Sequence, residues 1–257
     1  MKFITLTRKG LIMIFACVLM VAIALTITVR TASKAITTAS APRDIPIYCV
    51  SSDEKKVAIS FDAAWGNEQT EELLRILEEK EVRATFFLVG EWVDKYPESV
   101  KLIAEKGHDV ENHSDTHPYM TKLSTEQMIG EITSCNQKIQ DLTGEAPTLF
   151  RPPYGDYNNQ VVGAVKGAGM YCIQWDIDSL DWKDPTPQEM VQKITSKLTC
   201  GSIILMHNGA KNTPEALPQI IDAVKAQGYE FVPISELIPE GDYTTDHEGR
   251  MHLNTDS

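Results

Sequence analysis

The sequence predicts one α/β domain built on parallel strands, either a barrel or an open sheet. Short segments rich in β-branched or aromatic residues alternate with longer helical segments, and neither an internal repeat nor a second domain is visible. The expected strands cover residues 56–61, 83–89, 109–112, 148–151, 170–175, 203–207 and 231–234. The expected helices cover residues 68–79, 91–106, 124–142, 158–167, 187–198 and 214–227.

Helix ends are marked by residues that commonly start or stop helices. Ser124 followed by Gln127 forms a plausible capping box, and Gly107, Gly144 and Gly228 lie where helices should end. These signals support the alternation of strands and helices.

The amino-terminal segment predicts a membrane anchor. Lys2, Arg8 and Lys9 precede a run from Leu11 to Val29 that contains no charged residue. At a rise of about 1.5 Å per residue, such a helix is long enough to cross a bilayer, and basic residues ahead of it place the amino terminus in the cytoplasm. A cleaved signal peptide is the alternative.

The expected organisation follows from this anchor. We expect a single-pass protein of the cell membrane whose main domain lies outside the cytoplasm. The segments are residues 1–10 in the cytoplasm, 11–29 in the membrane, 30–52 as a tether rich in Thr, Ala and Ser, 53–239 as the globular domain and 240–257 as a polar tail.

The charge of the chain excludes some partners. It has 36 acidic and 24 basic side chains and a net charge of −12, and its first 34 residues contain no acidic residue. An acidic domain argues against nucleic acid and against docking on anionic polymers by bulk charge. We expect a monomer whose substrate is neutral or is recognised by a local pocket.

Four cysteines lie beyond the expected anchor. Cys49, Cys135, Cys172 and Cys200 could pair in three ways, but a domain of this size has a core without disulfides. We expect buried free thiols.

Polar residues follow the expected strands in a regular way. Asp62, His113, Arg151, Asp181 and His207 each come at or just after the end of an apolar segment. Because active residues of parallel α/β barrels gather at the carboxyl ends of the strands, these side chains are candidates for one site.

The spacing of His113 and His117 also indicates a metal. In a helix, residues four apart lie on one face, close enough to share an ion. Two histidines at this spacing can also be ordinary surface or core residues.

Each motif has a simpler interpretation when it is taken alone. Asp62 could cap a turn, and Arg151-Pro-Pro-Tyr154 could be a rigid loop. Trp182 could be a core aromatic residue, and His207 a buried histidine with satisfied hydrogen bonds. The order of the motifs along the chain favours a common site.

This ordered set resembles the polysaccharide deacetylase family, the NodB-homology carbohydrate esterases. The resemblance covers about residues 54–238, and the run from Ser60 to Gly66 is most similar to a sporulation-associated subgroup. It implies a distorted barrel of seven or eight strands, here preceded by a transmembrane helix. It also implies an enzyme that removes N-acetyl groups from chitin-like or peptidoglycan sugars. The implied cofactor is a divalent metal, and zinc is the one expected.

The resemblance assigns roles by position. It implies a catalytic set of Asp62 as general base, His207 as general acid, Arg151 orienting the base and Asp181 supporting the acid. It implies a substrate-binding set of Tyr154, through its backbone N–H, with Trp182 and Leu205 lining the acetate pocket. It implies His113 and His117 as metal ligands. Such a set provides the activated water, the oxyanion stabilisation and the proton that amide hydrolysis requires.

The chain departs from the family pattern at one position. Ala63 stands where the family has an Asp that is the third metal ligand, and Ala64-Trp65 stands where Gly-Pro is usual. Asp62 could enter the coordination shell, water could fill the gap, or the metal could be lost. Two alternatives therefore stay open: a non-catalytic glycan-binding or scaffold protein, and an esterase of other acetylated polysaccharides such as xylan.

Overall fold

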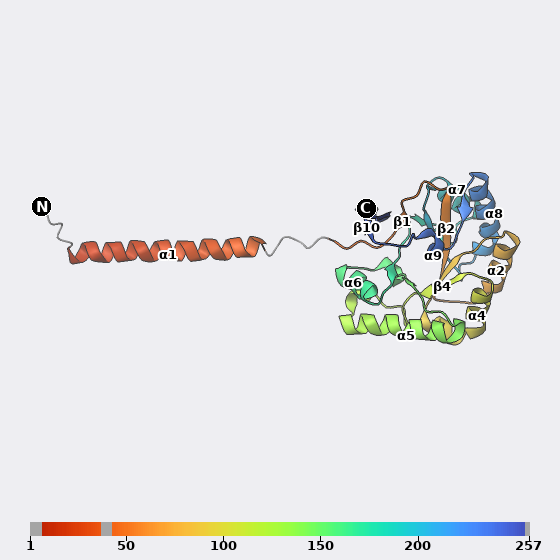
Figure 1. Ribbon diagram of the computed structural model, residues 1–257, viewed down its shortest axis with the longest axis horizontal. Helices are drawn as coiled ribbons and strands as arrows, with labels where there is room; N and C mark the ends of the chain where they lie inside the picture. The colour runs from red at the N-terminus through yellow and green to blue at the C-terminus, as the bar shows by residue number, and fades with distance from the viewer. Residues whose placement is uncertain (1–6, 37–42, 255–257) are drawn as a thin grey trace. The chain divides into compact units, whose positions relative to one another are not determined.

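The computed structural model describes residues 7–36 and 43–254 of the chain, which form two separate units. Helix α1 (Arg8–Ile36) belongs to the first unit, and every other element belongs to the second, which begins at Asp44 (Figure 1).

Helix α1 contains the apolar run that predicted a membrane span at residues 11–29. Among the described residues, however, no helix has both the length and the apolar character needed to cross a membrane. The expected transmembrane helix is therefore not supported.

The second unit is built on a curled parallel sheet. Its strands are β2 (Lys56–Ala63), β3 (Thr85–Leu88), β4 (Asp109–Asn112), β5 (Leu149–Phe150), β6 (Tyr171–Cys172), β7 (Ile177–Asp178), β8 (Ile203–His207) and β9 (Glu230–Phe231). They are hydrogen-bonded in the order β6-β5-β4-β3-β2-β8-β7, and β9 pairs with the start of β2. The expected parallel α/β sheet is confirmed. Within the described residues the sheet has eight strands and curls into a half-barrel whose end strands are β6 and β7, in agreement with the expected distorted barrel of seven or eight strands.

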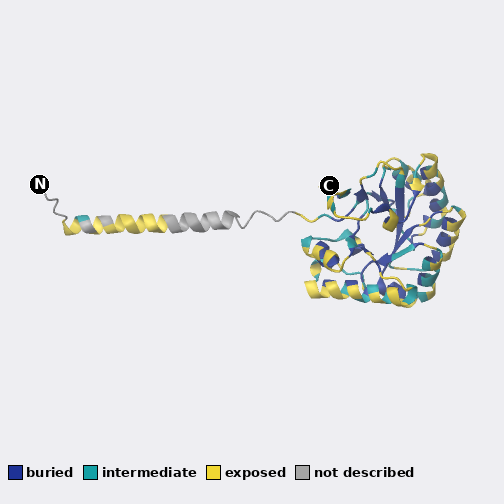
Figure 2. Ribbon diagram, viewed as in Figure 1, coloured by how far each residue is buried: buried dark blue, intermediate teal, exposed yellow. Residues whose placement is uncertain are grey.

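Helices surround this sheet, and their outward surfaces are exposed (Figures 1 and 2). They are α2 (Thr70–Glu79), α3 (Gly90–Lys95), α4 (Pro97–Glu105), α5 (Thr125–Thr143), α6 (Asn159–Gly167), α7 (Pro187–Thr195), α8 (Thr213–Ala226) and α9 (Ile234–Leu237). Short 3₁₀ turns η1 (Met120–Lys122), η2 (Pro153–Gly155) and η3 (Asp181–Lys183) lie in the connections.

Two details of the helices bear on the sequence predictions. The capping box of Ser124 and Gln127 begins α5, and Gly144 ends it in the left-handed conformation, with φ 81°. The expected helix over 91–106 is instead two helices, because Tyr96 precedes Pro97 and adopts φ −131°, ψ 53°. A proline disfavours the α conformation in the residue before it.

A small second sheet joins the two ends of the globular unit. Strand β1 (Cys49–Val50) pairs in parallel with β11 (Arg250–Leu253), which pairs antiparallel with β10 (Tyr243–Thr245). The expected tether over 30–52 and polar tail over 240–257 therefore take part in folded structure at Cys49–Val50 and from Tyr243 to Leu253. Residues 37–42 and 255–257 lie outside the described part. Pairing between such distant segments leaves no local periodicity in the sequence.

The described cysteines are all free, as expected. Cys49, Cys135 and Cys172 are buried as expected, whereas Cys200 is only partly buried. The Cys135 thiol donates a hydrogen bond of 3.3 Å to the Leu88 carbonyl.

The two faces of β2 separate the core from the site. Phe61 and Ala63 belong to the apolar core between the sheet and the helices. Ser60 and Asp62 alternate with them and face the inside of the curled sheet, where they contact Arg151. The period of two along one strand thus places a carboxylate inside the half-barrel.

Candidate active site

The predicted site residues come together at the carboxyl end of the sheet. A cavity of about 450 Å³ is lined by Asp62, Ala64, Trp65, His113, His117, Tyr154, Trp175, Asp178, Trp182, Leu205 and His207. Strand pairing aligns Asp62 with His207 across β2 and β8. Arg151 and Asp181 do not line the cavity; both are fully buried behind it.

Arg151 holds Asp62 on one side of the cavity. Its Nη1 donates to Asp62 Oδ1 at 2.7 Å, and its Nη2 donates to Ser60 Oγ at 2.9 Å and to the Gln174 carbonyl at 3.2 Å. Burial opposes ionisation of Asp62, but attraction to Arg151 and the histidines outweighs it and lowers the pKa of this carboxyl. Asp62 is therefore an ionised, oriented acceptor.

His113 is fixed in one tautomer. Its Nδ1 donates to the Arg151 carbonyl at 2.7 Å, so Nε2 carries the lone pair and lies 3.4 Å from Asp62 Oδ2. Burial lowers the pKa of His113. Burial, with repulsion from His113 when that ring is protonated, lowers the pKa of His117 to about 4. The two rings are 5.0 Å apart. The segment that carries them is a loop, not the helix that the four-residue spacing suggested: Ser114 and His117 have positive φ angles of 69° and 61°.

Asp181 holds His207 on the other side. Asp181 Oδ1 accepts from His207 Nδ1 at 2.7 Å, while Oδ2 accepts from the His207 backbone N–H at 2.7 Å and from Thr213 Oγ1 at 2.8 Å. Burial alone would lower the pKa of His207, but the hydrogen bond and charge of Asp181 outweigh it and raise this pKa. The Nε2 nitrogen of His207 is therefore available to a substrate in the cavity.

Exposed aromatic side chains surround the mouth of the cavity. They are Trp65, Tyr119, Tyr154 and Trp182, with exposures of 46, 54, 58 and 53%. Tyr154 packs between Tyr119, whose ring is stacked at 4.3 Å, and His117, whose ring lies at 4.5 Å. Tyr154 also has a positive φ of 59°, which is uncommon for a residue other than glycine. Leu205 is buried and lines the cavity from β8.

Several residues of the site were not assigned from the sequence. Ser60 accepts a hydrogen bond from Arg151, and Thr213 donates one to Asp181. The Trp175 ring lies 5.6 Å from the Arg151 guanidinium. Trp65 lies 5.3 Å from the His207 ring. A tryptophan directly after a strand end was the available signal for Trp65, whereas the others are visible only through contacts between distant segments.

The donor atoms decide whether a metal fits. His113 Nε2, His117 and Asp62 lie at the cavity, but Ala63 supplies no donor and is fully buried in the apolar core. Among the residues described, no group of three or more His, Cys, Asp or Glu has metal-binding geometry. Catalytic zinc ordinarily takes three protein ligands and a water. The described residues do not fit such a site.

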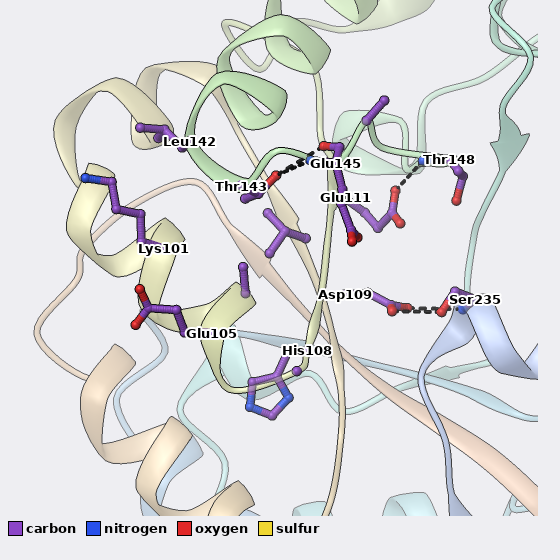
Figure 3. A pocket seen from close by; sticks show the side chains of 14 residues that line it. Lys101, Glu105, His108, Asp109, Glu111, Leu142, Thr143, Glu145, Thr148 and Ser235 are labelled. Carbon is purple, nitrogen blue, oxygen red and sulfur yellow. Dashed lines mark hydrogen bonds between the residues drawn. The ribbon is translucent and has the colours of Figure 1, made fainter.

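A second cavity of about 630 Å³ lies at the opposite end of the strands (Figure 3). Two of its acidic groups are occupied: Glu111 Oε2 accepts from the backbone N–H groups of Thr148 and Leu149 at 2.9 and 2.7 Å, and Asp109 accepts from Ser235. Burial raises the pKa of Glu111 to about 8. These contacts join strands and loops, so we assign the chemistry to the smaller cavity.

Comparison with known proteins identifies the family. The family model described as polysaccharide deacetylase matches residues 50–173. A peptidoglycan-N-acetylglucosamine deacetylase of Bacillus cereus is 34% identical over 194 residues, which cover 74% of this chain and 91% of the relative. The chain belongs to the polysaccharide deacetylase family.

Two further members are similar to this deacetylase-family chain. Peptidoglycan-N-acetylglucosamine deacetylase PgdA of Listeria monocytogenes is 39% identical over 72% of the chain and 39% of PgdA. The solved structure of BA3943 from Bacillus anthracis, described as a CE4 family pseudoenzyme, superposes with a TM-score of 0.73 at 37% identity, over 75% of this chain and 68% of BA3943. A BA3943 mutant described as having restored enzymatic activity gives the same TM-score. The chain spans 39–61% of the length of the first curated relatives that it matches.

Proposed function

We propose that the chain is an N-deacetylase that removes acetyl groups from the amino sugars of peptidoglycan. One observation carries the proposal: Asp62, paired with Arg151, and His207, paired with Asp181, lie side by side on β2 and β8 at one cavity. Family membership and the names of PgdA and the B. cereus relative support the substrate class.

The reaction is hydrolysis of an amide. The water oxygen bonds to the acetyl carbonyl carbon while Asp62 accepts a proton from this water. The Tyr154 backbone N–H donates to the oxyanion that forms. His207 then gives its proton to the nitrogen as the C–N bond breaks, which leaves acetate and a free amine. Arg151 and Asp181 position the base and the acid through the hydrogen bonds described above.

The lining of the cavity suits an acetylated sugar. Leu205 and Trp182 provide apolar walls for the acetyl methyl group. The exposed rings of Trp65, Tyr119 and Tyr154 can pack against the apolar faces of sugar rings, which a neutral polymer offers and which need no basic surface.

We also propose that the domain acts outside the cytoplasm, where peptidoglycan is found. The similarity of Ser60–Gly66 to a sporulation-associated subgroup supports peptidoglycan made during spore formation as the substrate. Cell fractionation combined with protease treatment of intact protoplasts tests the location. A protease-resistant domain in intact protoplasts would contradict it.

A second candidate function is a non-catalytic glycan-binding or scaffold role. Ala63 and the incomplete ligand set favour it, and BA3943 is a family member described as a pseudoenzyme. The retention of Asp62, Arg151, Asp181 and His207 together favours the enzyme, because a scaffold has no chemical need for a base and an acid with their partners.

Acetate release decides between these functions. The purified full chain is incubated with N-acetylglucosamine oligomers, peptidoglycan and acetylated xylan over a range of pH and divalent metals. We expect release from at least one N-acetylated substrate, and a loss of about 10²-fold or more in Asp62→Asn. If neither N-acetylated substrate is cleaved while wild type and Asp62→Asn both bind peptidoglycan, the scaffold role is correct. Release from xylan alone identifies the esterase.

A further inference from the structure

The backbone of the loop from His113 to His117 adopts a conformation that its own hydrogen bonds do little to stabilise. Ser114 and His117 both adopt left-handed conformations, which are uncommon outside glycine. One internal contact is the hydrogen bond of 3.0 Å from the His117 N–H to Ser114 Oγ. Such a loop persists only where its surroundings fix it.

Glu131 on α5 supplies the largest set of side-chain contacts to this loop. Its Oε2 accepts from the backbone N–H groups of Asp115 at 2.9 Å and Thr116 at 2.8 Å. Its Oε1 accepts from Thr116 Oγ1 at 2.8 Å. One carboxylate therefore binds two consecutive backbone groups and a hydroxyl immediately before His117.

The start of α3 holds the other edge of the loop. The N–H groups of Gly90 and Glu91 donate to the carbonyls of Ser114 and Asp115, each at 2.9 Å. There is no space at Gly90 for a side chain, because a Cβ there would lie 2.0 Å from Asp115 Oδ1. The loop is thus fixed between α3 and α5. Ser134 and Lys138 on α5 bind the Asp115 side chain, whereas the contacts with the loop backbone come from Glu131 and can be removed by mutation.

We propose that Glu131 is a positioning residue for the deacetylase site. By fixing Asp115 and Thr116 it sets the place of His117 between the rings of His113 and Tyr154. Glu131 does not line the cavity. The placement of the loop by Glu131 is a property of the fold alone. The effect of Glu131 on catalysis rests on the proposed deacetylase function.

The test compares Glu131→Ala with Glu131→Gln and with Asp141→Ala. Gln keeps one oxygen that can accept both backbone N–H groups. Asp141 is an exposed acid on the same helix whose carboxylate accepts from Gln137, so it controls for loss of a charge from α5. All are made in the full chain.

Amide hydrogen exchange gives the first readout. In Glu131→Ala we expect Asp115 and Thr116 to exchange about tenfold faster or more, with strand amides such as that of Ile204 unchanged. The His117 ring proton shifts should move because the Tyr154 ring is close, while those of His207 stay. Both readouts should be nearly normal in Glu131→Gln and Asp141→Ala. Unchanged exchange and unchanged His117 shifts in Glu131→Ala would overturn the proposal.

Kinetics give the second readout. Per folded molecule, kcat should fall on the order of tenfold to a hundredfold in Glu131→Ala and recover in Glu131→Gln. A lower melting temperature with kcat per folded molecule unchanged would reduce Glu131 to a structural role and overturn the proposal. If the wild type releases no acetate but the exchange and ring shifts change as expected, the placement by Glu131 stands and the deacetylase function fails.

Discussion

Arg151 contacts both Asp62 and His113, the first through its guanidinium and the second through its backbone carbonyl. Its guanidinium holds Asp62, and its carbonyl accepts from His113 Nδ1 and so directs Nε2 toward Asp62. The guanidinium is fully buried and lies 4.0 Å from the centre of the Phe87 ring. A lysine cannot reproduce this planar set of donors, so Arg151 is specific to its position.

Asp181→Asn should move the alkaline limit of activity. Burial works against the protonated form of His207, and Asp181 more than compensates and raises its pKa. A raised pKa keeps the acid protonated to higher pH, so wild-type kcat should fall only as pH rises through this raised value. Without the Asp181 charge, the fall should begin at lower pH.

Acetate release from pH 5 to 10 measures this shift. Asp178→Asn is the matched control, because Asp178 contributes the smaller attraction to His207 and accepts from the Leu180 N–H. It should move the limit less than Asp181→Asn. Equal alkaline limits in wild type and Asp181→Asn would exclude His207 as the general acid.

At the scale of elements, a side chain partly replaces strand pairing between β4 and β5. The two strands pair at Asn112 and Phe150 alone. One step earlier along β4, Glu111 Oε2 accepts from the N–H of Thr148 (Figure 3) and from the N–H of Leu149. This bond holds together the part of the sheet that carries His113 and Arg151, the residues that follow β4 and β5.

Glu111 should make the stability depend on pH. Burial raises its pKa from 4.5 to about 8, so the folded chain keeps a proton that the unfolded chain loses in this range. Its contribution to the free energy of unfolding is therefore greatest below pH 4.5 and falls as pH rises to about 8. Glu111→Gln keeps an acceptor for the two N–H groups and should remove this dependence.

Chemical denaturation at several pH values tests this prediction. Relative to wild type, Glu111→Gln should gain about 1.4 kcal/mol for each unit by which the pKa of Glu111 is raised, once pH exceeds that pKa. Glu145 is an exposed acid that lines the same cavity of about 630 Å³ as Glu111. The stability of Glu145→Gln should therefore depend on pH as that of the wild type does. Parallel curves for wild type and Glu111→Gln would show that Glu111 is ionised in the folded state.

At the scale of the molecule, local patterns predicted the elements that have local causes. Strands β4 and β8 have the expected bounds, and the Ser124 capping box starts α5 where predicted. Strands β1, β7, β10 and β11 were not predicted, because they are two to four residues long. Strands β1, β7 and β11 also depend on pairing with distant segments, whereas β10 pairs with the nearby β11. Pro97 was a visible signal for a helix break, and the apolar periodicity over 91–106 obscured it.

The site shows the same division. The positions of Asp62 and His207 at strand ends follow from apolar runs that the sequence displays. The hydrogen bonds of Ser60 with Arg151 and of Thr213 with Asp181 depend on contacts between segments that only the fold brings together. The same holds for the hydrogen bonds that Glu131 accepts from Asp115 and Thr116. The direction of Ala63 has a local cause, because β2 continues past the expected end at residue 61 and its period-two alternation places Ala63 on the face opposite Asp62, in the core.

The last prediction concerns Ala63 and zinc. Because Ala63 is fully buried beside Phe61 and Leu88, an unpaired carboxylate in Ala63→Asp should lower the melting temperature of the metal-free chain. If that carboxylate turns to join His113 and His117, zinc should restore the stability, by about 2.7 kcal/mol at a hundredfold excess over Kd. The wild type should bind zinc weakly or substoichiometrically, and His113→Ala should abolish binding.

Calorimetric titration and thermal melting of the full chain measure both effects. Ala63→Asn is the matched control: it has the same size as Asp but is neutral, so it should be destabilised and gain little from zinc. Absence of any zinc-dependent rise in the melting temperature of Ala63→Asp would mean that position 63 cannot reach the histidines from its place in the core. Tight stoichiometric binding by the wild type, unchanged in Ala63→Asp, would instead show that another group already completes the site. Asp62 is then the ligand to test, because its Oδ2 already lies 3.4 Å from His113 Nε2.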